Sequence, residues 1–340
     1  MRILIDGMGG DNSPEAIVKG VVNAAADLDS NITLSILGPE ETIRKLLKKD
    51  KYKNKGKGAV IEVINCTEVI SCDESPAMAV KRKKNSTIVV GMDLLREKKA
   101  DAFISAGSTG ALLAGGLLHL GRIHGIKRPG IAAWIPRIGK EGTTLLLDCG
   151  ASVETKPEYL LQYGIMGSLF VKGVKGIERP SVKLLNIGAE DAKGDELHKT
   201  ANQLLRESNI NFCGNIEGRD VVFGDCDVVV TDGFSGNIFI KGTEGMALAI
   251  MKQFKKKLSE GTIAKAGAML AYNKIKEIKN EFDYSYVGGA PILGLKAPVL
   301  KIHGNSESVD IYYAIMKSIP YVENDITGMI AEAVARNKEL

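Results

Sequence analysis

Three polar residues that could bind an anion or move a proton follow short apolar runs of the chain: Lys193, Asp232 and His303. The ammonium of Lys193 is a point charge that could hold phosphate, although composition alone favours a solvated loop lysine. Asp232 directly ends one apolar run, where a carboxylate is costly to bury unless it has partners, and this favours a functional role. Of the four histidines, only His303 lies at the end of such a run.

Two glycine-rich turns could cradle an anion with backbone N–H groups. Gly107-Ser108-Thr109-Gly110 joins a predicted strand to an apolar helix, whose first N–H groups are unpaired donors. A plain turn with a Ser or Thr cap explains the same residues equally well. The turn 8–12 contains two glycines that permit close approach to a ligand, but its Asp and Asn are also typical of an Asx turn. The substrate-binding candidates of these and the other strand-end loops are Gly9, Gly10, Asp11, Gly107, Ser108, Thr109, Gly110, Asn186, Ser235, Asn237 and Ser306.

Several motifs of other enzyme classes are absent from the sequence. No G-x-G-x-x-G follows a predicted strand, no Walker A sequence occurs, and the residues around Ser235 lack the spacing of a nucleophile elbow. Cys149 could accept an acyl group, but no base is recognisable near it in sequence, which favours a small buried cysteine. The five cysteines include no C-x-x-C pair, which argues against a disulfide framework or a zinc site. We therefore expect no cofactor and no metal.

The elements that must position these residues alternate between short apolar runs and helical patterns. This alternation indicates an α/β fold with a largely parallel sheet covered by helices on both faces. Such sheets bind ligands at the carboxyl ends of their strands, where this chain places its polar and glycine residues. No linker divides the chain, so we expect a single α/β catalytic unit over residues 1–340. The predicted strands are 2–5, 32–37, 60–64, 101–105, 144–147, 182–186, 228–231 and 298–302.

Composition excludes several classes of partner and location. The 340 residues are 44% hydrophobic and 25% charged, as in ordinary globular proteins. A net charge of +4 is too weak to indicate nucleic acid. Asp6 interrupts what would be the apolar region of a secretory signal, and no apolar run approaches the roughly 20 residues of a membrane span. We therefore expect a cytoplasmic protein.

Taken together, short segments along nearly the whole chain carry a family resemblance. In order, these segments are Asp6-Gly-Met-Gly-Gly-Asp11, Glu74-Ser-Pro76, Ile88-Val-Val-Gly91, Asp101-Ala-Phe-Ile-Ser-Ala-Gly107, Gly121-Arg-Ile123, Leu185-Asn-Ile-Gly188, Lys193-Gly194, Gly214-Asn-Ile-Glu-Gly-Arg-Asp220, Asp232-Gly-Phe-Ser-Gly-Asn237, Gly288-Gly-Ala-Pro291 and His303-Gly304. The chain thereby resembles the bacterial acyl-carrier-protein:phosphate acyltransferase (PlsX) family. It departs from the family at Ser108 and Ser152, where Asn is common, at Cys149, where a small apolar residue is usual, and at Ser235, where Thr is usual.

The resemblance implies an enzyme that moves a long-chain fatty acyl group from acyl carrier protein to inorganic phosphate. The acyl phosphate product then serves a membrane glycerol-phosphate acyltransferase in phospholipid synthesis. The family is homodimeric, needs no cofactor or metal, associates peripherally with the membrane, and has a fold similar to isopropylmalate dehydrogenase and phosphate acetyltransferase. We hypothesise that Lys193 binds phosphate, that His303 donates toward the oxyanion or the leaving sulfur, and that Asp232 orients one of them. Two alternatives remain open: a phosphate acetyl- or butyryltransferase acting on acyl-CoA, and a non-catalytic sensor of acyl-ACP.

Residues 253–282 depart from the strand–helix alternation. They are helical in pattern and rich in lysine, so we expect an excursion that projects from the core. Within it, 261–280 is predicted as one helix with Ile263, Met269 and Leu270 roughly on one side and lysines around them. Such a stripe fits either a partner subunit or an anionic membrane surface. We expect dimer contacts at the base of the excursion and lipid contact at its tip, 263–270.

Overall fold

The computed structural model describes residues 1–49, 58–281 and 288–336. Its strands join into one mixed sheet with the order β3-β2-β1-β4-β11-β10-β5-β6-β9-β7-β8. The strands are β1 (Arg2–Asp6), β2 (Thr33–Gly38), β3 (Val60–Asn65), β4 (Ala102–Ser105), β5 (Gly130–Pro136), β6 (Thr143–Leu147), β7 (Ser181–Asn186), β8 (Asn211–Glu217), β9 (Val228–Val230), β10 (Ala290–Leu293) and β11 (Val299–Lys301). The largely parallel α/β sheet expected from the sequence is therefore confirmed.

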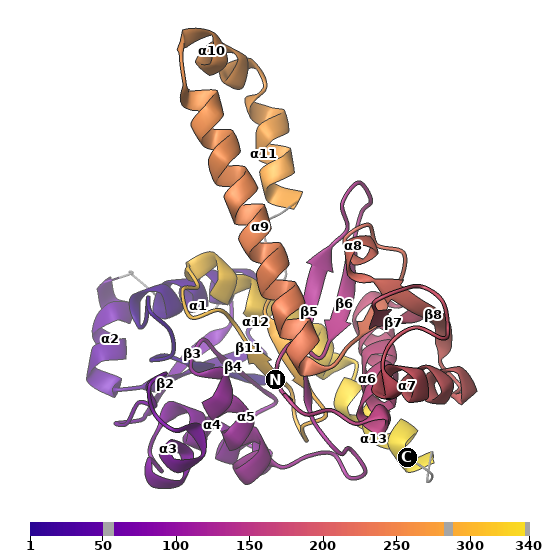
Figure 1. Cartoon of the computed structure of the whole chain (residues 1–340). Helices are drawn as coiled ribbons and strands as arrows, with labels where there is room; N and C mark the ends of the chain where they lie inside the picture. The colour runs from indigo at the N-terminus through magenta and orange to yellow at the C-terminus, as the bar shows by residue number, and fades with distance from the viewer. Residues whose placement is uncertain (50–57, 282–287, 337–340) are drawn as a thin grey trace.

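Helices cover both faces of this sheet (Figure 1). They are α1 (Glu15–Asp27), α2 (Glu40–Lys49), α3 (Pro76–Arg82), α4 (Thr87–Arg96), α5 (Thr109–Gly115), the π-helical turn η1 (Gly116–Leu120), α6 (Pro157–Lys175), α7 (Glu196–Glu207), α8 (Gly218–Val221), α9 (Gly233–Ser259), α10 (Thr262–Leu270), α11 (Tyr272–Glu281), α12 (Ser308–Glu323) and α13 (Ile326–Arg336).

Side chains alternate between the two faces along each buried strand. In β1, Ile3 and Ile5 pack in the core under α1, α6 and α12, whereas Leu4 packs in a second core under α3, α4 and α5. The short β9 repeats this alternation, with Val229 facing the second core. Strands that are apolar on both sides are typical of parallel sheets covered by two helix layers, which is why these runs were recognisable in sequence.

The middle of the sheet differs from the sequence prediction. Strands β3, β2, β1, β4 and β11 are parallel, but β10 is antiparallel to both β11 and β5, and β5 is antiparallel to β6. Strands β6, β9, β7 and β8 are again parallel. Three reversals separate the two parallel groups, so the groups run in opposite directions. The polar strand ends therefore belong to two opposed sets rather than to one edge.

A helical hairpin projects from the sheet (Figure 1). It begins as α9, which starts at the end of β9 and continues without a break to Ser259. The helix predicted over 261–280 is wrong in detail, because the chain turns at Ala271 between α10 and α11. Figure 1 shows α10 at the tip of the hairpin and α11 running back toward the body of the protein.

Candidate functional site

Three loops of the first parallel group meet backbone to backbone. They follow β1, β4 and β11 and contain Gly9, Gly10, Gly107 and Gly304. A Cβ on Gly9 would lie 2.6 Å from the Gly107 nitrogen, and one on Gly10, whose φ is +92°, would lie 2.7 Å from the Gly304 oxygen. The Asp11 N–H donates to that same oxygen at 2.6 Å. The predicted glycines are thus brought together because only glycine permits this approach.

The buried Asp6 and the half-buried Lys301 form hydrogen bonds that support these loops. Asp6 accepts hydrogen bonds from the Ser105 hydroxyl at 2.6 Å and the Met8 N–H at 3.1 Å, and burial raises the pKa of its carboxyl. The Lys301 ammonium donates to the carbonyls of Ala106 and Ile302, and burial lowers its pKa to about 8. Our sequence analysis did not select either residue for the site. The sequence pattern that could have indicated Asp6 and Lys301 is a charged residue at the end of an apolar run, because burying a charge without partners is costly.

The 107–110 turn forms the start of a short helix. Ser108 is the N-cap of α5 and accepts from the Ala111 N–H at 3.4 Å. A Cβ on Gly110 would lie 2.7 Å from Cγ of Pro76, so helix packing accounts for that glycine. The capping interpretation is therefore present in the structure, and anion binding by Ser108 and Thr109 stays a prediction.

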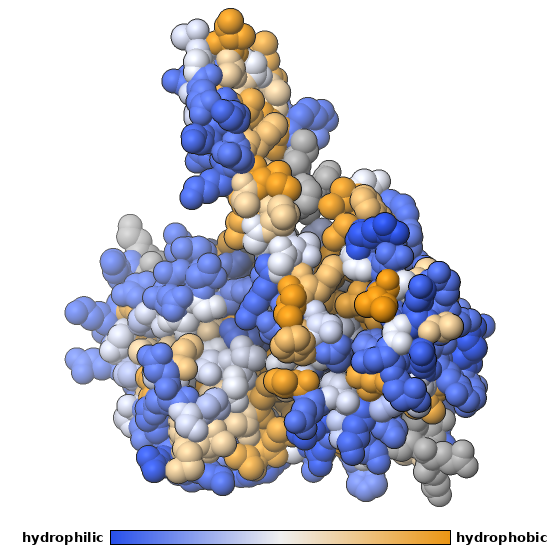
Figure 2. All heavy atoms as spheres, in the orientation of Figure 1, coloured by the Kyte–Doolittle hydropathy of each residue, from blue (hydrophilic) through white to orange (hydrophobic). Residues whose placement is uncertain are grey.

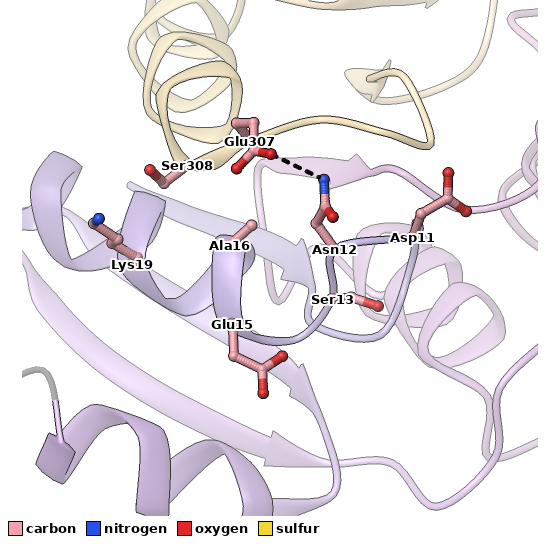
Figure 3. Close-up of a pocket in the computed structure, with 8 residues that line it drawn as sticks. All are labelled: Asp11, Asn12, Ser13, Glu15, Ala16, Lys19, Glu307 and Ser308. Atoms are coloured by element: carbon pink, nitrogen blue, oxygen red, sulfur yellow. Dashed lines mark hydrogen bonds between the residues drawn. The ribbon is translucent and has the colours of Figure 1, made fainter.

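A cavity of about 460 Å³ opens beside the same loops (Figure 3). The Asn12 amide closes one side by donating to the Asn305 carbonyl at 3.0 Å and to Glu307 at 3.4 Å. Three carboxylates and one lysine line it, a balance that disfavours phosphate. The cavity is lined by Asp11, Asn12, Ser13, Glu15, Ala16, Lys19, Glu307 and Ser308.

A second cluster lies where β6 and β9 end. Asp148 accepts from the backbone N–H groups of Ile131, Gly150, Ala151 and Ser152, and burial nevertheless raises its pKa to about 6. The Asn237 amide of α9 donates to the Cys149 carbonyl at 3.1 Å. Asp148 thus organises the loop on which the first turns of α9 rest.

Asp232 has a structural role in this second cluster. Its carboxylate accepts from the Phe234 N–H at 3.0 Å and the Ser235 N–H at 2.9 Å, as the N-cap of α9. The hypothesis that Asp232 orients Lys193 or His303 is not supported by these contacts. A carboxylate at a helix N-terminus is already satisfied by backbone donors and by the helix dipole.

Lys193 lies in the neighbouring loop, between β7 and α7. Its side chain is exposed, and its carbonyl accepts from the Asn186 amide at 3.0 Å. The Asn186 side-chain oxygen also accepts from the Ile187 N–H at 2.8 Å. Asn186 therefore shapes the loop that carries Lys193. Because β7 and β9 are parallel neighbours, Lys193 and Asp232 follow strands that end at the same edge.

His303 belongs to the opposite group of strands and is met by α9. Its Nε2 lies 3.7 Å from Oε1 of Glu244. Twelve residues separate Asp232 from Glu244, which corresponds to about 18 Å along a helix. The structure thus separates Asp232 from His303, and Glu244 is the carboxylate beside the histidine. Sequence analysis missed Glu244 because no local pattern reports which strand end a long helix will pass.

Comparisons with known proteins show the family to which the chain belongs. Residues 1–329 match the family described as fatty acid synthesis protein. The phosphate acyltransferase of Brevibacillus brevis is 45% identical over 337 residues, which cover 99% of this chain and 98% of that protein. The phosphate acyltransferase of Bacillus licheniformis is 43% identical over 339 residues and covers all of both chains. The chain belongs to this phosphate acyltransferase family. The expected enzyme class, an acyltransferase of lipid synthesis, is confirmed.

The fold of the acyltransferase is similar to that of two solved phosphotransacetylases. A phosphotransacetylase from Streptococcus pyogenes superposes with a TM-score of 0.61 at 18% identity and covers 95% of this chain and 94% of its own. EutD phosphotransacetylase from Staphylococcus aureus gives 0.57 at 17% identity, with the same coverage. The expected likeness to phosphate acetyltransferase is therefore confirmed for the fold.

Among residues 1–49, 58–281 and 288–336, no group of three His, Cys, Asp or Glu residues is placed to hold a metal ion. None of the helices described there has the length and apolar character needed to cross a membrane.

Proposed function

We propose that the acyltransferase transfers a long-chain fatty acyl group from acyl carrier protein to inorganic phosphate and releases an acyl phosphate. The full-length similarity to phosphate acyltransferases carries this proposal. The phosphotransacetylase-like fold is in keeping with it, because both reactions would join an acyl group to phosphate. Acyl carrier protein and phosphate are the substrates, and the product would supply a membrane glycerol-phosphate acyltransferase.

The chemistry requires little from the protein beyond positioning. Phosphate is already an oxyanion at neutral pH, and a thiolate leaves readily because thiol pKa values lie near ~8.5. The site must therefore hold two reactants in line and stabilise a tetrahedral oxyanion. Lys193 supplies an exposed positive charge for phosphate, and His303 supplies a donor toward the oxyanion or the leaving sulfur. These roles for Lys193 and His303 require only residues in loops at strand ends, and they require no catalytic triad.

The test is formation of acyl phosphate in a defined mixture. Purified protein, acyl-ACP and phosphate are incubated, and hydroxylamine traps acyl phosphate as a hydroxamate. We expect hydroxamate and free ACP to appear only with phosphate present, and to persist in chelator. Lys193→Ala should lower kcat/KM about tenfold or more, while Lys199→Ala, on the following helix, should not. Unchanged ACP release without phosphate would contradict the proposal.

The same assay separates the two alternative functions. The phosphotransacetylase-like fold gives the acyl-CoA alternative a specific basis. If acetyl- or butyryl-CoA supports faster turnover than long-chain acyl-ACP, the enzyme is a phosphate acetyl- or butyryltransferase. If acyl-ACP shifts the melting temperature but neither donor yields acyl phosphate, the protein is a sensor.

We further propose that the protein is a homodimer that touches the membrane peripherally through the hairpin tip. Ile263 is 89% exposed and Leu270 is 92% exposed, and α10 has no buried residue. Figure 2 displays apolar residues at the tip and along one side of the hairpin, with hydrophilic residues along the other. An apolar stripe flanked by lysines suits an anionic lipid surface. The base of the hairpin would contact the partner subunit.

Two substitutions at the tip distinguish lipid contact from subunit contact. Ile263→Asp combined with Leu270→Asp should abolish flotation with anionic liposomes and leave activity in solution and dimer mass unchanged. Lys274→Asp, on the exposed return helix, is the matched control for added negative charge and should weaken flotation only partly. Dissociation of the tip variant into monomers would instead identify an interface between subunits.

A further inference from the structure

The helix α9 carries one acidic residue, and that residue faces the candidate active centre. Within Gly233–Ser259 the only carboxylate is Glu244, among five lysines. Its side chain is 24% exposed, whereas the neighbouring Lys241, Gly245 and Met246 are exposed. Glu244 therefore points toward the body of the protein.

Glu244 lies where the two opposed sets of strand ends approach each other. Its Oε1 is 3.7 Å from Nε2 of His303, at the end of β11. About two turns earlier on the same helix, the Asn237 amide donates to the Cys149 carbonyl at 3.1 Å, in the loop after β6. The helix α9 thus contacts the first group of strands through Glu244 and the second group through Asn237.

Building on the proposed acyl transfer, we infer that Glu244 is a positioning residue for His303. A carboxylate beside Nε2 keeps a proton on that nitrogen and directs Nδ1 at the substrate, where the ring can donate toward the oxyanion or the leaving sulfur when Nδ1 carries a second proton. The 3.7 Å separation is longer than a hydrogen bond, as is common in unliganded sites whose contacts tighten when substrate binds. The histidine is 71% exposed, so without such a partner its ring would sample many orientations.

The surroundings of Glu244 leave room for a substrate beside this pair. Gly242 and Gly245 flank it on α9, and a Cβ at either position would have no atom within 4 Å. Surface pairs of a carboxylate and a cation ordinarily contribute little to stability. Removal of Glu244 should therefore change catalysis much more than folding.

A double-mutant cycle on Glu244 and His303 tests the inference with the hydroxylamine assay. In the otherwise unchanged enzyme, Glu244→Gln should lower kcat about tenfold and leave the KM for phosphate within about twofold. Glu244→Asp, which keeps the charge but shortens the reach, should recover part of the loss. In the His303→Ala background, Glu244→Gln should have little further effect, because residues that act through one another are not additive. Glu260→Gln, beyond the outer end of α9, is the matched control and should leave kcat unchanged.

Each contrary result overturns the inference in a recognisable way. Equal losses for Glu244→Gln in both backgrounds would mean that Glu244 acts independently of His303. Normal kcat in Glu244→Gln, or normal kcat in His303→Ala, would remove the coupling altogether. If Glu244→Gln lowers the melting temperature by more than a few degrees, the same cycle is measured with the folded Glu244→Asp variant. Full activity of Glu244→Asp, with no coupling to His303, would then contradict the inference. Failure of the unmodified enzyme to form acyl phosphate would instead contradict the proposed function.

Discussion

Cys149 is buried just after β6, and this environment makes its thiol a poor nucleophile. Burial, together with the charges of Asp148 and Glu244, raises the pKa of its thiol well above the ordinary value, so the reactive thiolate is disfavoured. We predict that Cys149→Ala keeps at least half of the wild-type kcat, measured by trapped acyl phosphate. An inactive but folded variant would instead support a covalent acyl-cysteine intermediate.

Asp148 gives a pH-dependent prediction of stability. Burial raises the pKa of its carboxyl to about 6 in the folded state, against an ordinary value of 3.8. The folded state therefore binds the proton more tightly, and this contribution to stability is present below about pH 4 and lost as pH rises through about 6. The unfolding free energy of wild type minus that of Asp148→Asn should fall by about 2–3 kcal/mol between pH 4 and pH 7, since one pKa unit is about 1.4 kcal/mol. Urea unfolding at several pH values measures this difference, and a pH-independent difference would contradict the prediction.

At the level of single residues, sequence reasoning found the loops but not all of their contacts. Gly9, Gly10 and Asn237 were predicted as site residues, and the structure places each in close contact with a neighbouring loop. Asp232 was predicted from the cost of a carboxylate at a strand end, yet backbone donors of α9 satisfy it. Glu244 could not be found in this way, because its contact with His303 depends on where a helix of 27 residues passes over the sheet.

Two glycines on the exposed part of α9 offer a prediction at the level of the element. Gly242 and Gly245 have no neighbour within 4 Å of a built Cβ, and neither has a positive φ. Alanine should therefore raise the unfolding free energy by about 0.5–1 kcal/mol at each position through helix propensity. We predict that Gly245→Ala stabilises the protein in urea unfolding but lowers kcat/KM, if substrate approaches the helix beside Glu244. Stabilisation without any change in activity would mean that the glycine surface is not approached.

The strands were predicted unevenly, and the reason is their pattern. Runs such as β1 and β9 are apolar on both faces and were recognised. The four-residue β10 contains Pro291, and β5 begins at the glycine of the Pro129-Gly130 pair, so both resemble loops in sequence. These two strands provide the antiparallel pairs that oppose the two halves of the sheet. Missing them made the strand ends look like a single edge.

At the scale of the whole molecule, α9 begins at the second cluster, passes His303 at Glu244 and continues to the hairpin tip as one helix (Figure 1). The base of α9 packs on the loop after β6 at Gly236. A Cβ there would collide with the Asp148 carbonyl oxygen and lie 2.7 Å from the Thr231 methyl group. A side chain there must tilt the helix, and a small tilt at the base displaces Glu244 and moves the tip further still. Overpacking of this kind typically costs about 1–3 kcal/mol.

We therefore predict that Gly236→Ala lowers the unfolding free energy by about that amount, kcat/KM by tenfold or more, and flotation with anionic liposomes, all together. The tip variant Ile263→Asp with Leu270→Asp should lose flotation alone, because it leaves the base of α9 in place. Gly242→Ala, on the same helix but without a neighbour, is the control for adding a methyl group and should not destabilise the protein. If Gly236→Ala is destabilised in urea and yet keeps normal kcat/KM and normal flotation, the packing at the base of α9 does not set the geometry of the site. In that case the base of α9, the Glu244–His303 pair and the hairpin tip are not mechanically coupled.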